Sequence, residues 1–258
     1  MSDPLDEAAA RELEYHNKLY SGFAQRHFAK PAVVAFREYL VRRIVKTARI
    51  DSTSRVLSIG CGIGDTEILL ARHAAHITGV DLSPAGIESA RAAAARQGVR
   101  NAEFVAAAFD GERFAGRQFD AVIAVFVLHH LADRIATHVA PAIHRLLRPG
   151  GMFYALDPSY YRLSGFIGKL IAPSLMKKHQ SEDEEELRPA ATWRAFEEAG
   201  FEVTPAYHDF VSTPLAGLWP EGVIAYRVTR AVDQALIRIP LLKRLSSNFE
   251  VIARRPGG

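Results

Sequence analysis

Between residues 55 and 157, short apolar runs alternate with longer segments in which apolar residues recur at helical spacing. The runs have the length and composition of buried strands. The predicted strands are residues 55–59, 76–80, 102–106, 121–126 and 152–156, and the predicted helices between them are residues 65–75, 84–97 and 132–147. This alternation predicts βαβ units and a parallel sheet that is covered by helices on both faces.

Turn and capping residues support these boundaries. Ser83 and Pro84 are typical of a helix start, and Gly98 is typical of a helix end. The run RPGG at residues 148–151 closes a helix with a turn before the fifth strand. Residues 201–207 and 248–254 also have strand composition, which gives the sheet two further strands.

Additional helical segments precede and interrupt this pattern. Residues 12–48 carry apolar and aromatic side chains at helical spacing, with breaks at Ser21-Gly22 and at Pro31. Two long connections, about 159–190 and 208–247, are unusual for a compact domain unless they contain their own elements or serve function. We therefore expect an N-terminal helical cover over residues 1–50 and a main domain over residues 51–258 with two helical insertions.

Composition narrows the function classes. The chain has 258 residues, 48% of them hydrophobic and 24% charged, which is ordinary for a globular protein. Its net charge of +3 does not indicate a nucleic-acid partner. Cys61 is the single cysteine, so an internal disulfide framework is excluded. The acidic N-terminus lacks a signal-peptide core and no run of about 18 apolar residues occurs, so we expect a cytoplasmic location.

The first predicted strand ends in three glycines at alternate positions, in the run VLSIGCGIGD at residues 56–65. Without Cβ atoms, Gly60 and Gly62 can adopt positive φ and let a ligand lie against bare backbone. Parallel sheets bind ligands at the carboxyl ends of their strands, and the following helix offers unpaired N–H groups. We therefore expect a ligand at this turn, with a tight strand-to-helix connection as the plainer alternative.

The spacing of the glycines indicates which ligand binds. The dinucleotide fingerprint is G-x-G-x-x-G, whereas this chain has G-x-G-x-G followed by Asp65, an acid that would sit badly beside a pyrophosphate. Asp81 ends the next predicted strand, 21 residues after Gly60, where a carboxylate can accept hydrogen bonds from both hydroxyls of a ribose. These features predict a nucleoside ligand without a tightly held phosphate.

At this point the chain resembles the class I S-adenosylmethionine-dependent methyltransferases, in particular those that act on small molecules. The matching runs are VLSIGCGIGD, TGVDLSPAGIESAR, QFDAVIAVFVLHHLAD and HRLLRPGGMFYALDP. The resemblance covers residues 55–157 well and residues 192–207 and 248–254 more loosely. It implies a Rossmann-like, doubly wound, seven-stranded α/β sheet that is mostly parallel with an antiparallel last strand. It also implies S-adenosyl-L-methionine as cofactor, S-adenosyl-L-homocysteine as product and a small-molecule acceptor.

The resemblance also implies a set of cofactor-binding positions. The glycine turn passes under the methionine and ribose, Asp81 holds the ribose hydroxyls, Leu82 covers adenine, and the N-terminal region folds over the cofactor. The implied cofactor-binding residues are Tyr20, Ser58, Gly60, Cys61, Gly62, Gly64, Asp81, Leu82, Ala108, Phe109, Asp110, Val125 and Phe126. Cys61 is interpreted as a small residue of the turn and not as a nucleophile.

Two positions depart from the family pattern. The family usually has an acid where this chain has Ser58, so a carboxylate near the amino group of the ligand is missing and a hydroxyl or another residue must serve. The family often has an acid where Ala108 stands, and Asp110 is the alternative contact to the adenine amino group. The glycine turn and Asp81 are unaffected.

Methyl transfer requires an aligned acceptor and, for a hydroxyl or ammonium, removal of a proton. His129, His130 and Asp157 follow the fourth and fifth predicted strands and are the candidate catalytic residues. We expect the two histidines to point in different directions, with His129 the better candidate base. Alternatively the histidines shape the turn, and Asp157 caps a helix. No cluster of His, Cys, Asp and Glu has metal-ligand spacing, so we expect no metal.

The composition of the two insertions indicates what kind of acceptor the protein binds. Residues 161–178 and 223–245 are apolar stretches edged by basic residues, a pattern that suits a pocket for an oily acceptor, a membrane surface, helix packing or a dimer face. The acidic run at 181–184 reads as a capping box. The sequence predicts methyl transfer to a small, hydrophobic or lipid-like acceptor, with O-methylation favoured by general abundance. Rival hypotheses are a noncatalytic S-adenosylmethionine-binding regulatory module and, less favoured, a nicotinamide-dependent oxidoreductase.

Overall fold

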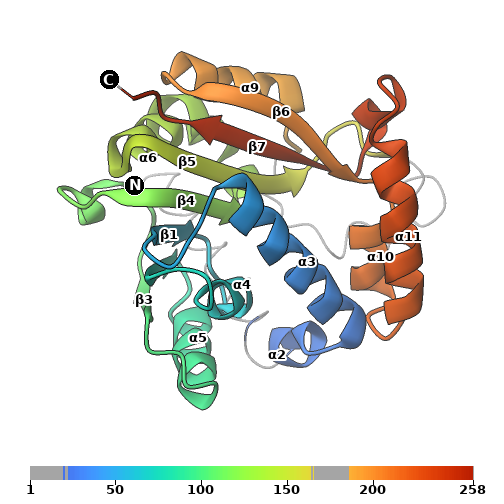
Figure 1. Ribbon diagram of the computed structural model, residues 1–258, viewed down its shortest axis with the longest axis horizontal. Helices are drawn as coiled ribbons and strands as arrows, with labels where there is room; N and C mark the ends of the chain where they lie inside the picture. The colour runs from blue at the N-terminus through green and yellow to red at the C-terminus, as the bar shows by residue number, and fades with distance from the viewer. Residues whose placement is uncertain (1–19, 21–22, 164, 166–185, 258) are drawn as a thin grey trace, which may run out of the picture.

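The computed structural model describes residue 20, residues 23–163, residue 165 and residues 186–257. A seven-stranded sheet forms its centre, in the order β3-β2-β1-β4-β5-β7-β6 (Figure 1). The strands are β1 (Arg55–Ile59), β2 (His76–Asp81), β3 (Ala102–Ala106), β4 (Phe119–Val125), β5 (Leu147–Pro158), β6 (Glu202–Asp209) and β7 (Asn248–Arg254). Strands β1 to β5 pair in parallel, while β7 is antiparallel to β5 and β6. The predicted doubly wound sheet with an antiparallel last strand is confirmed.

Helices cover both faces of this sheet (Figure 1). The helices are α2 (Phe23–Phe28), α3 (Pro31–Thr47), α4 (Asp65–Leu70), α5 (Pro84–Arg96), α6 (Ala140–Leu146), α9 (Pro189–Glu198), α10 (Ser212–Leu218) and α11 (Val223–Leu236). Neighbouring residues of β1 point to opposite faces, so Val56 packs in the core beneath α3 and Leu57 in the core beneath α6 and α9. The buried strands thus place their carboxyl ends, and the loops that follow them, along one edge.

Two predicted helices end differently from the pattern. The helix predicted over 65–75 ends at Leu70, because the Asn101 amide donates to the carbonyls of Ala71 and Ala74 and holds that segment in a turn. The helix predicted over 132–147 divides into η2 (Leu128–Arg134), η3 (Ile135–Val139) and α6. Pro141 lacks the N–H that a continuous α-helix would donate to Thr137, which accounts for the widened turn before α6.

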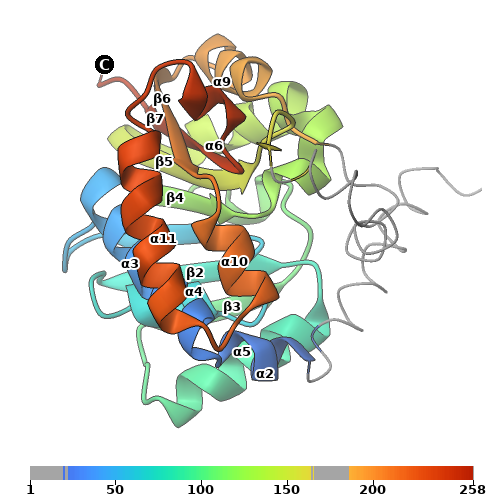
Figure 2. The same ribbon diagram turned by 90° about the vertical axis from the view of Figure 1, so that its right-hand side faces the viewer.

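The second insertion forms α10, α11 and the short η4 (Leu242–Leu245). These elements stand beyond the carboxyl ends of β4 and β5, beside α3 (Figures 1 and 2). Buried carboxylates fix them there: Asp209 accepts from Thr213 N at 2.6 Å, and Asp233 accepts from Ser212 N at 2.8 Å. The insertion is therefore a packed part of the binding edge.

Most of the first insertion, including the predicted capping box at 181–184, lies outside the described residues. Its described ends meet where Ser159 pairs with Leu187 and Tyr160 N donates to Leu187 O. Among the helices of the described residues, none is both long enough and apolar enough to cross a membrane.

Candidate functional site

The glycine turn lies at the carboxyl end of β1 and leads into α4, as predicted. Gly60, Gly62 and Gly64 have φ values of 68°, 50° and 75°, a region that side chains with a Cβ rarely adopt. Each is also close to a neighbour. A Cβ on Gly60 would lie 2.4 Å from Val127 Cγ2, and one on Gly64 would lie 2.9 Å from Ala90 Cβ. The turn is therefore bare for two reasons, backbone conformation and close packing.

Asp81 ends β2 beside this turn. Its carboxylate accepts hydrogen bonds from Gly62 N at 2.7 Å and from Ser83 N at 2.8 Å. A carboxylate has about four lone-pair sites, so two remain for a ligand. Ser83 in turn caps α5 by accepting from Gly86 N, as its position before Pro84 predicts.

Tyr20 lies over the glycine turn. A Cβ on Gly62 would be 2.8 Å from the Tyr20 hydroxyl oxygen, and one on Gly86 would be 2.9 Å from its ring. Burial raises the pKa of the Tyr20 phenol well above its usual range, and the charges of Asp81 and Asp65 raise it further. This residue of the N-terminal region thus reaches the turn although about 40 residues separate them along the chain.

The other expected adenine contacts follow β2 and β3 at the same edge. Ala107 N donates to Asp81 O at 2.8 Å, which draws the segment containing Ala108, Phe109 and Asp110 alongside Asp81 and Leu82. Phe109 packs partly against the core. The Asp110 carboxylate accepts from Arg113 N at 3.2 Å at the start of the short η1 (Glu112–Phe114). Their contacts to adenine stay predictions.

Val125 ends β4, and Phe126 follows it next to the turn. Phe126 has φ of 56°, a left-handed conformation that is costly for a bulky residue and that is concentrated at functional sites. Its N–H donates to Leu156 O, and its ring stacks on Phe36 of α3 with centroids 6.2 Å apart. The backbone is thus held in this conformation from two sides.

His129 and Asp157 form a pair at the ends of β4 and β5. His129 Nδ1 lies 2.8 Å from Asp157 Oδ1, and Asp157 is 1% exposed. Burial raises the pKa of Asp157, against the opposing pull of the His129 hydrogen bond. The prediction that His129 and His130 point in different directions is wrong, because their ring centroids lie 4.0 Å apart. The short η2, in which Leu128 is buried, turns both rings to the same side.

Ser58 has a partner that the sequence analysis missed. Its hydroxyl donates to Glu67 Oε1 at 2.5 Å, and both side chains are buried. Burial raises the pKa of Glu67 to about 7. A charged residue in the apolar face of a predicted helix was the only sequence signal for it. Cys61, also buried, has its thiol pKa raised by burial and by the charge of Glu67.

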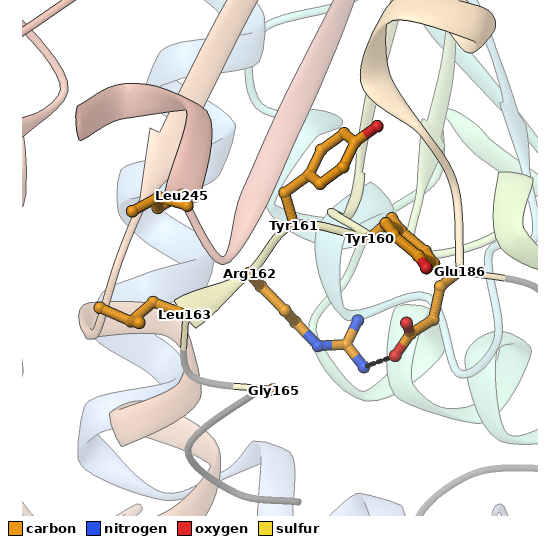
Figure 3. Close-up of a pocket in the computed structure, with 7 residues that line it drawn as sticks. All are labelled: Tyr160, Tyr161, Arg162, Leu163, Gly165, Glu186 and Leu245. Carbon is orange, nitrogen blue, oxygen red and sulfur yellow. Dashed lines mark hydrogen bonds and ion pairs between the residues drawn. The ribbon is translucent and has the colours of Figure 1, made fainter. Parts of the chain in front are cut away.

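A cavity of about 420 Å³ opens in the segment that follows β5 (Figure 3). Its lining residues are Tyr160, Tyr161, Arg162, Leu163, Gly165, Glu186 and Leu245. Arg162 and Glu186 form an ion pair of 2.9 Å, so the charges in the wall are paired and the remaining lining is aromatic and aliphatic. Among the described residues, no group of three or more His, Cys, Asp or Glu side chains is arranged to hold a metal ion.

Comparisons with known proteins agree with this geometry. A family model described as "Methyltransferase domain" matches residues 56–151. The chain is 31% identical over 184 residues to the ubiquinone biosynthesis O-methyltransferase of Methylobacterium sp. (strain 4-46), which covers 67% of this chain and 71% of the relative. It is 27% identical over 205 residues to the protein of the same name from Sinorhizobium fredii, which covers 78% of this chain and 73% of the relative.

Among solved structures, the magnesium protoporphyrin IX methyltransferase of Synechocystis PCC 6803 with bound SAH has the same fold. The TM-score is 0.62 at 15% identity, covering 94% of this chain and 97% of that chain. The domain match and a relative that is 31% identical over most of its length establish that this chain belongs to the class I S-adenosylmethionine-dependent methyltransferase family.

Proposed function

We propose that this methyltransferase transfers the methyl group of S-adenosylmethionine to a hydroxyl group of a small, apolar acceptor. The observation that carries the proposal is the His129–Asp157 pair, which lies beside the glycine turn where β4 and β5 end. Relatives that are named O-methyltransferases also support transfer to oxygen.

The residues at the turn fit the cofactor. Asp81 has acceptor capacity left for the two ribose hydroxyls, and the positive φ of the three glycines gives the turn a backbone path that residues with a Cβ rarely adopt. Tyr20 lies over the turn and Phe36 of α3 stacks on Phe126, which supports the described part of the N-terminal region, Tyr20 and residues 23–50, as a cover over the cofactor site. When bound, S-adenosylmethionine supplies an electrophilic methyl group on a sulfonium whose leaving group departs neutral, so the leaving group needs no acid.

The protein's own chemistry is then alignment and proton removal. Asp157 accepts a hydrogen bond from the Nδ1–H group of His129, which fixes the orientation of the ring and the tautomer in which Nε2 carries no proton. A base of this kind takes the proton of an acceptor hydroxyl as its oxygen attacks. The negative charge of Asp157 stabilises the imidazolium that forms, because both groups are shielded from water.

The cavity after β5 supports an apolar acceptor. Tyr160 and Tyr161 pack edge to face, with ring centroids 5.2 Å apart, and Leu163 and Leu245 add aliphatic side chains to the lining (Figure 3). Such a lining binds the aromatic or aliphatic part of a ligand, while a few polar groups determine its orientation and specificity. The similarity to proteins of ubiquinone biosynthesis is consistent with a lipophilic acceptor.

The face of α11 supports contact with an anionic membrane surface. Ile224, Val228 and Val232 repeat every four residues and are exposed, and Leu218 and Leu241 near the two ends of α11 are 80% and 78% exposed. Asp233, the single acid between residues 223 and 247, is buried, whereas three arginines there are exposed: Arg227, Arg238 and Arg244. An apolar stripe edged by cations fits the headgroups of anionic lipids.

Two experiments test these proposals. Incubation with methyl-labelled S-adenosylmethionine and a panel of phenols with apolar tails should label the hydroxyl oxygen, and phenols already methylated should stay unlabelled. Label on amines or carbons alone would contradict O-methylation.

Sedimentation with phosphatidylglycerol vesicles tests the membrane contact. The natural protein should sediment with the vesicles, and the double variant Ile224→Ser with Val228→Ser should stay in the supernatant. Equal binding to neutral phosphatidylcholine vesicles would contradict the charge argument.

A further inference from the structure

Glu67 is a buried carboxylate in the helix that directly follows the glycine turn. It is the third residue of α4, is 3% exposed, and reaches back to β1, where Oε1 accepts from Ser58. Its second oxygen, Oε2, has no hydrogen-bond partner among the described residues. Burial of a carboxylate oxygen without a partner costs stability. Packing alone therefore gives no reason for a carboxylate at this position.

The position of Glu67 connects it to the cofactor site. Ser58 lies two residues before Gly60 on the same strand, and Cys61 lies within the turn. The charge of Glu67 acts on the Cys61 thiol more strongly than the charge of Asp81 does. The Glu67 carboxylate is therefore bonded to the strand that leads into the turn, and its charge acts on Cys61 within the turn.

The charges around the turn favour a cation. Asp65, Glu67 and Asp81 supply three carboxylates, and one guanidinium, that of Arg37 in α3, approaches them among the described residues. Arg37 Nε pairs with Asp65 at 2.6 Å, and its Nη1 donates to Thr66. Within the part of the chain that the structure describes, no ion pair joins Glu67 or Asp81 to a side-chain cation. A ligand that carries positive charge would balance them.

We propose that Glu67, acting through Ser58, is the positioning residue that holds the α-ammonium group of S-adenosylmethionine at the turn. This inference rests on the proposed function. In this protein the carboxylate belongs to Glu67 of α4 and accepts a hydrogen bond from the Ser58 hydroxyl, whereas related proteins usually have the acid at the position of Ser58 itself. The inference also accounts for the Oε2 atom, which has no hydrogen-bond partner among the described residues: its negative charge stabilises the bound ligand and makes no contact within the protein.

Proton release from Glu67 on ligand binding provides a second way to test the proposal. Burial and the charge of Asp65 raise its pKa, the Ser58 hydrogen bond and Arg37 lower it, and the value is about 7. Cys61 in the turn, Asp65 in its own helix and Arg37 in α3 are the titratable and charged groups that face it. A cation beside Glu67 favours its ionised form, so binding should release a proton below about pH 7 and tighten as pH rises through that range.

The test titrates the full-length protein with S-adenosylmethionine, S-adenosylhomocysteine and 5′-methylthioadenosine by calorimetry. The first two ligands carry the ammonium group of the amino-acid end, and 5′-methylthioadenosine lacks it; because the last two are both uncharged at sulfur, comparing them excludes an effect of the sulfonium. Glu67→Gln should weaken binding of S-adenosylmethionine and S-adenosylhomocysteine by about tenfold or more and leave 5′-methylthioadenosine within about twofold. The proton release, measured in buffers of different ionisation enthalpy, should disappear. Glu88→Gln, which neutralises an exposed acid on α5, is the matched control and should change neither affinity.

A second variant moves the charge. Ser58→Asp combined with Glu67→Gln should restore most of the affinity for S-adenosylmethionine. If Glu67→Gln binds S-adenosylhomocysteine as tightly as the natural protein, the inference is overturned because the carboxylate has no role at the ammonium group. It is also overturned if the variant loses affinity for S-adenosylhomocysteine and 5′-methylthioadenosine equally, because the carboxylate then only supports the turn. If the natural protein binds none of the three ligands, the proposed function itself fails.

Discussion

The imidazole of His129 and the carboxylate of Asp157 are held 2.8 Å apart by two neighbouring parallel strands, although 28 residues separate them in the chain. Val125 at the end of β4 pairs with Leu156 in β5, and this register sets the positions of both residues. A second hydrogen bond, from His129 N to Asp157 Oδ1, fixes the backbone as well. The pair is thus positioned by the sheet, next to the glycine turn.

If His129 is the base, its removal should slow methyl transfer without weakening cofactor binding. We expect His129→Asn to lower kcat by about 100-fold or more, which is the usual contribution of general base catalysis. Single-turnover transfer and calorimetry with S-adenosylhomocysteine measure the two effects separately. His138→Asn, which changes an exposed histidine on η3, is the control. Full activity of His129→Asn would exclude the base.

Asp81 should contribute to cofactor affinity. We expect Asp81→Ala to weaken binding of S-adenosylmethionine by about 1 to 3 kcal/mol, because the charged hydrogen bonds to the ribose are lost. Asp133→Ala, at an exposed acid of the same edge, should leave the dissociation constant unchanged. An unaltered affinity in Asp81→Ala would mean that the ribose is held elsewhere.

Alanine substitutions at Gly62 and Gly98 distinguish the cost of backbone strain from the cost of steric crowding. Both have positive φ, but a Cβ on Gly62 would meet the Tyr20 hydroxyl, whereas one on Gly98 would meet nothing within 4 Å. Gly98→Ala should cost about 1 kcal/mol of unfolding free energy from strain alone. Gly62→Ala should cost more, and Tyr20→Ala should recover part of the difference. Equal losses in urea titrations would show that Tyr20 does not press on the turn.

Much of this edge could be predicted from local sequence. The glycine turn, Asp81 and the capping Ser83 are short-range features in which residue type determines backbone conformation or a nearby hydrogen bond. The contact between Ser58 and Glu67 and the pairing of His129 with Asp157 depend on strand order and helix placement, which periodicity does not encode. The early end of α4 likewise depends on Asn101, a distant residue whose amide donates to the carbonyls of Ala71 and Ala74 just after the helix.

Glu250 should be a major contributor to stability. Its buried carboxylate accepts from Arg43 Nε at 3.0 Å, from the Tyr154 hydroxyl at 2.9 Å and pairs with His208 Nδ1 at 2.8 Å. Burial alone would raise its pKa, but the bonds from His208 and Arg43 outweigh burial and lower the pKa to about 2. Glu250→Gln should therefore cost about 3 to 5 kcal/mol of unfolding free energy at neutral pH.

The pH dependence of that loss has a definite sign. Because the folded pKa of Glu250 is lowered, its contribution is present above the unfolded value of 4.5 and is lost as pH falls towards 2. The gap between the natural protein and Glu250→Gln should narrow over that range in urea titrations. Glu202→Gln, which breaks the exposed pair with Arg254 on the neighbouring strand, should cost less than about 1 kcal/mol. Equal costs for the two variants would contradict the role of the buried network.

The central claim is that the turn formed by Gly60, Gly62 and Gly64, together with Asp81, is a site for S-adenosylmethionine. Calorimetric titration of the full-length protein with S-adenosylmethionine, S-adenosylhomocysteine and NAD tests it most directly. The account predicts one-to-one binding of the first two ligands, loss of affinity for both in Asp81→Ala, and no binding of NAD. Binding of NAD, or the absence of binding by both S-adenosyl compounds, would contradict it.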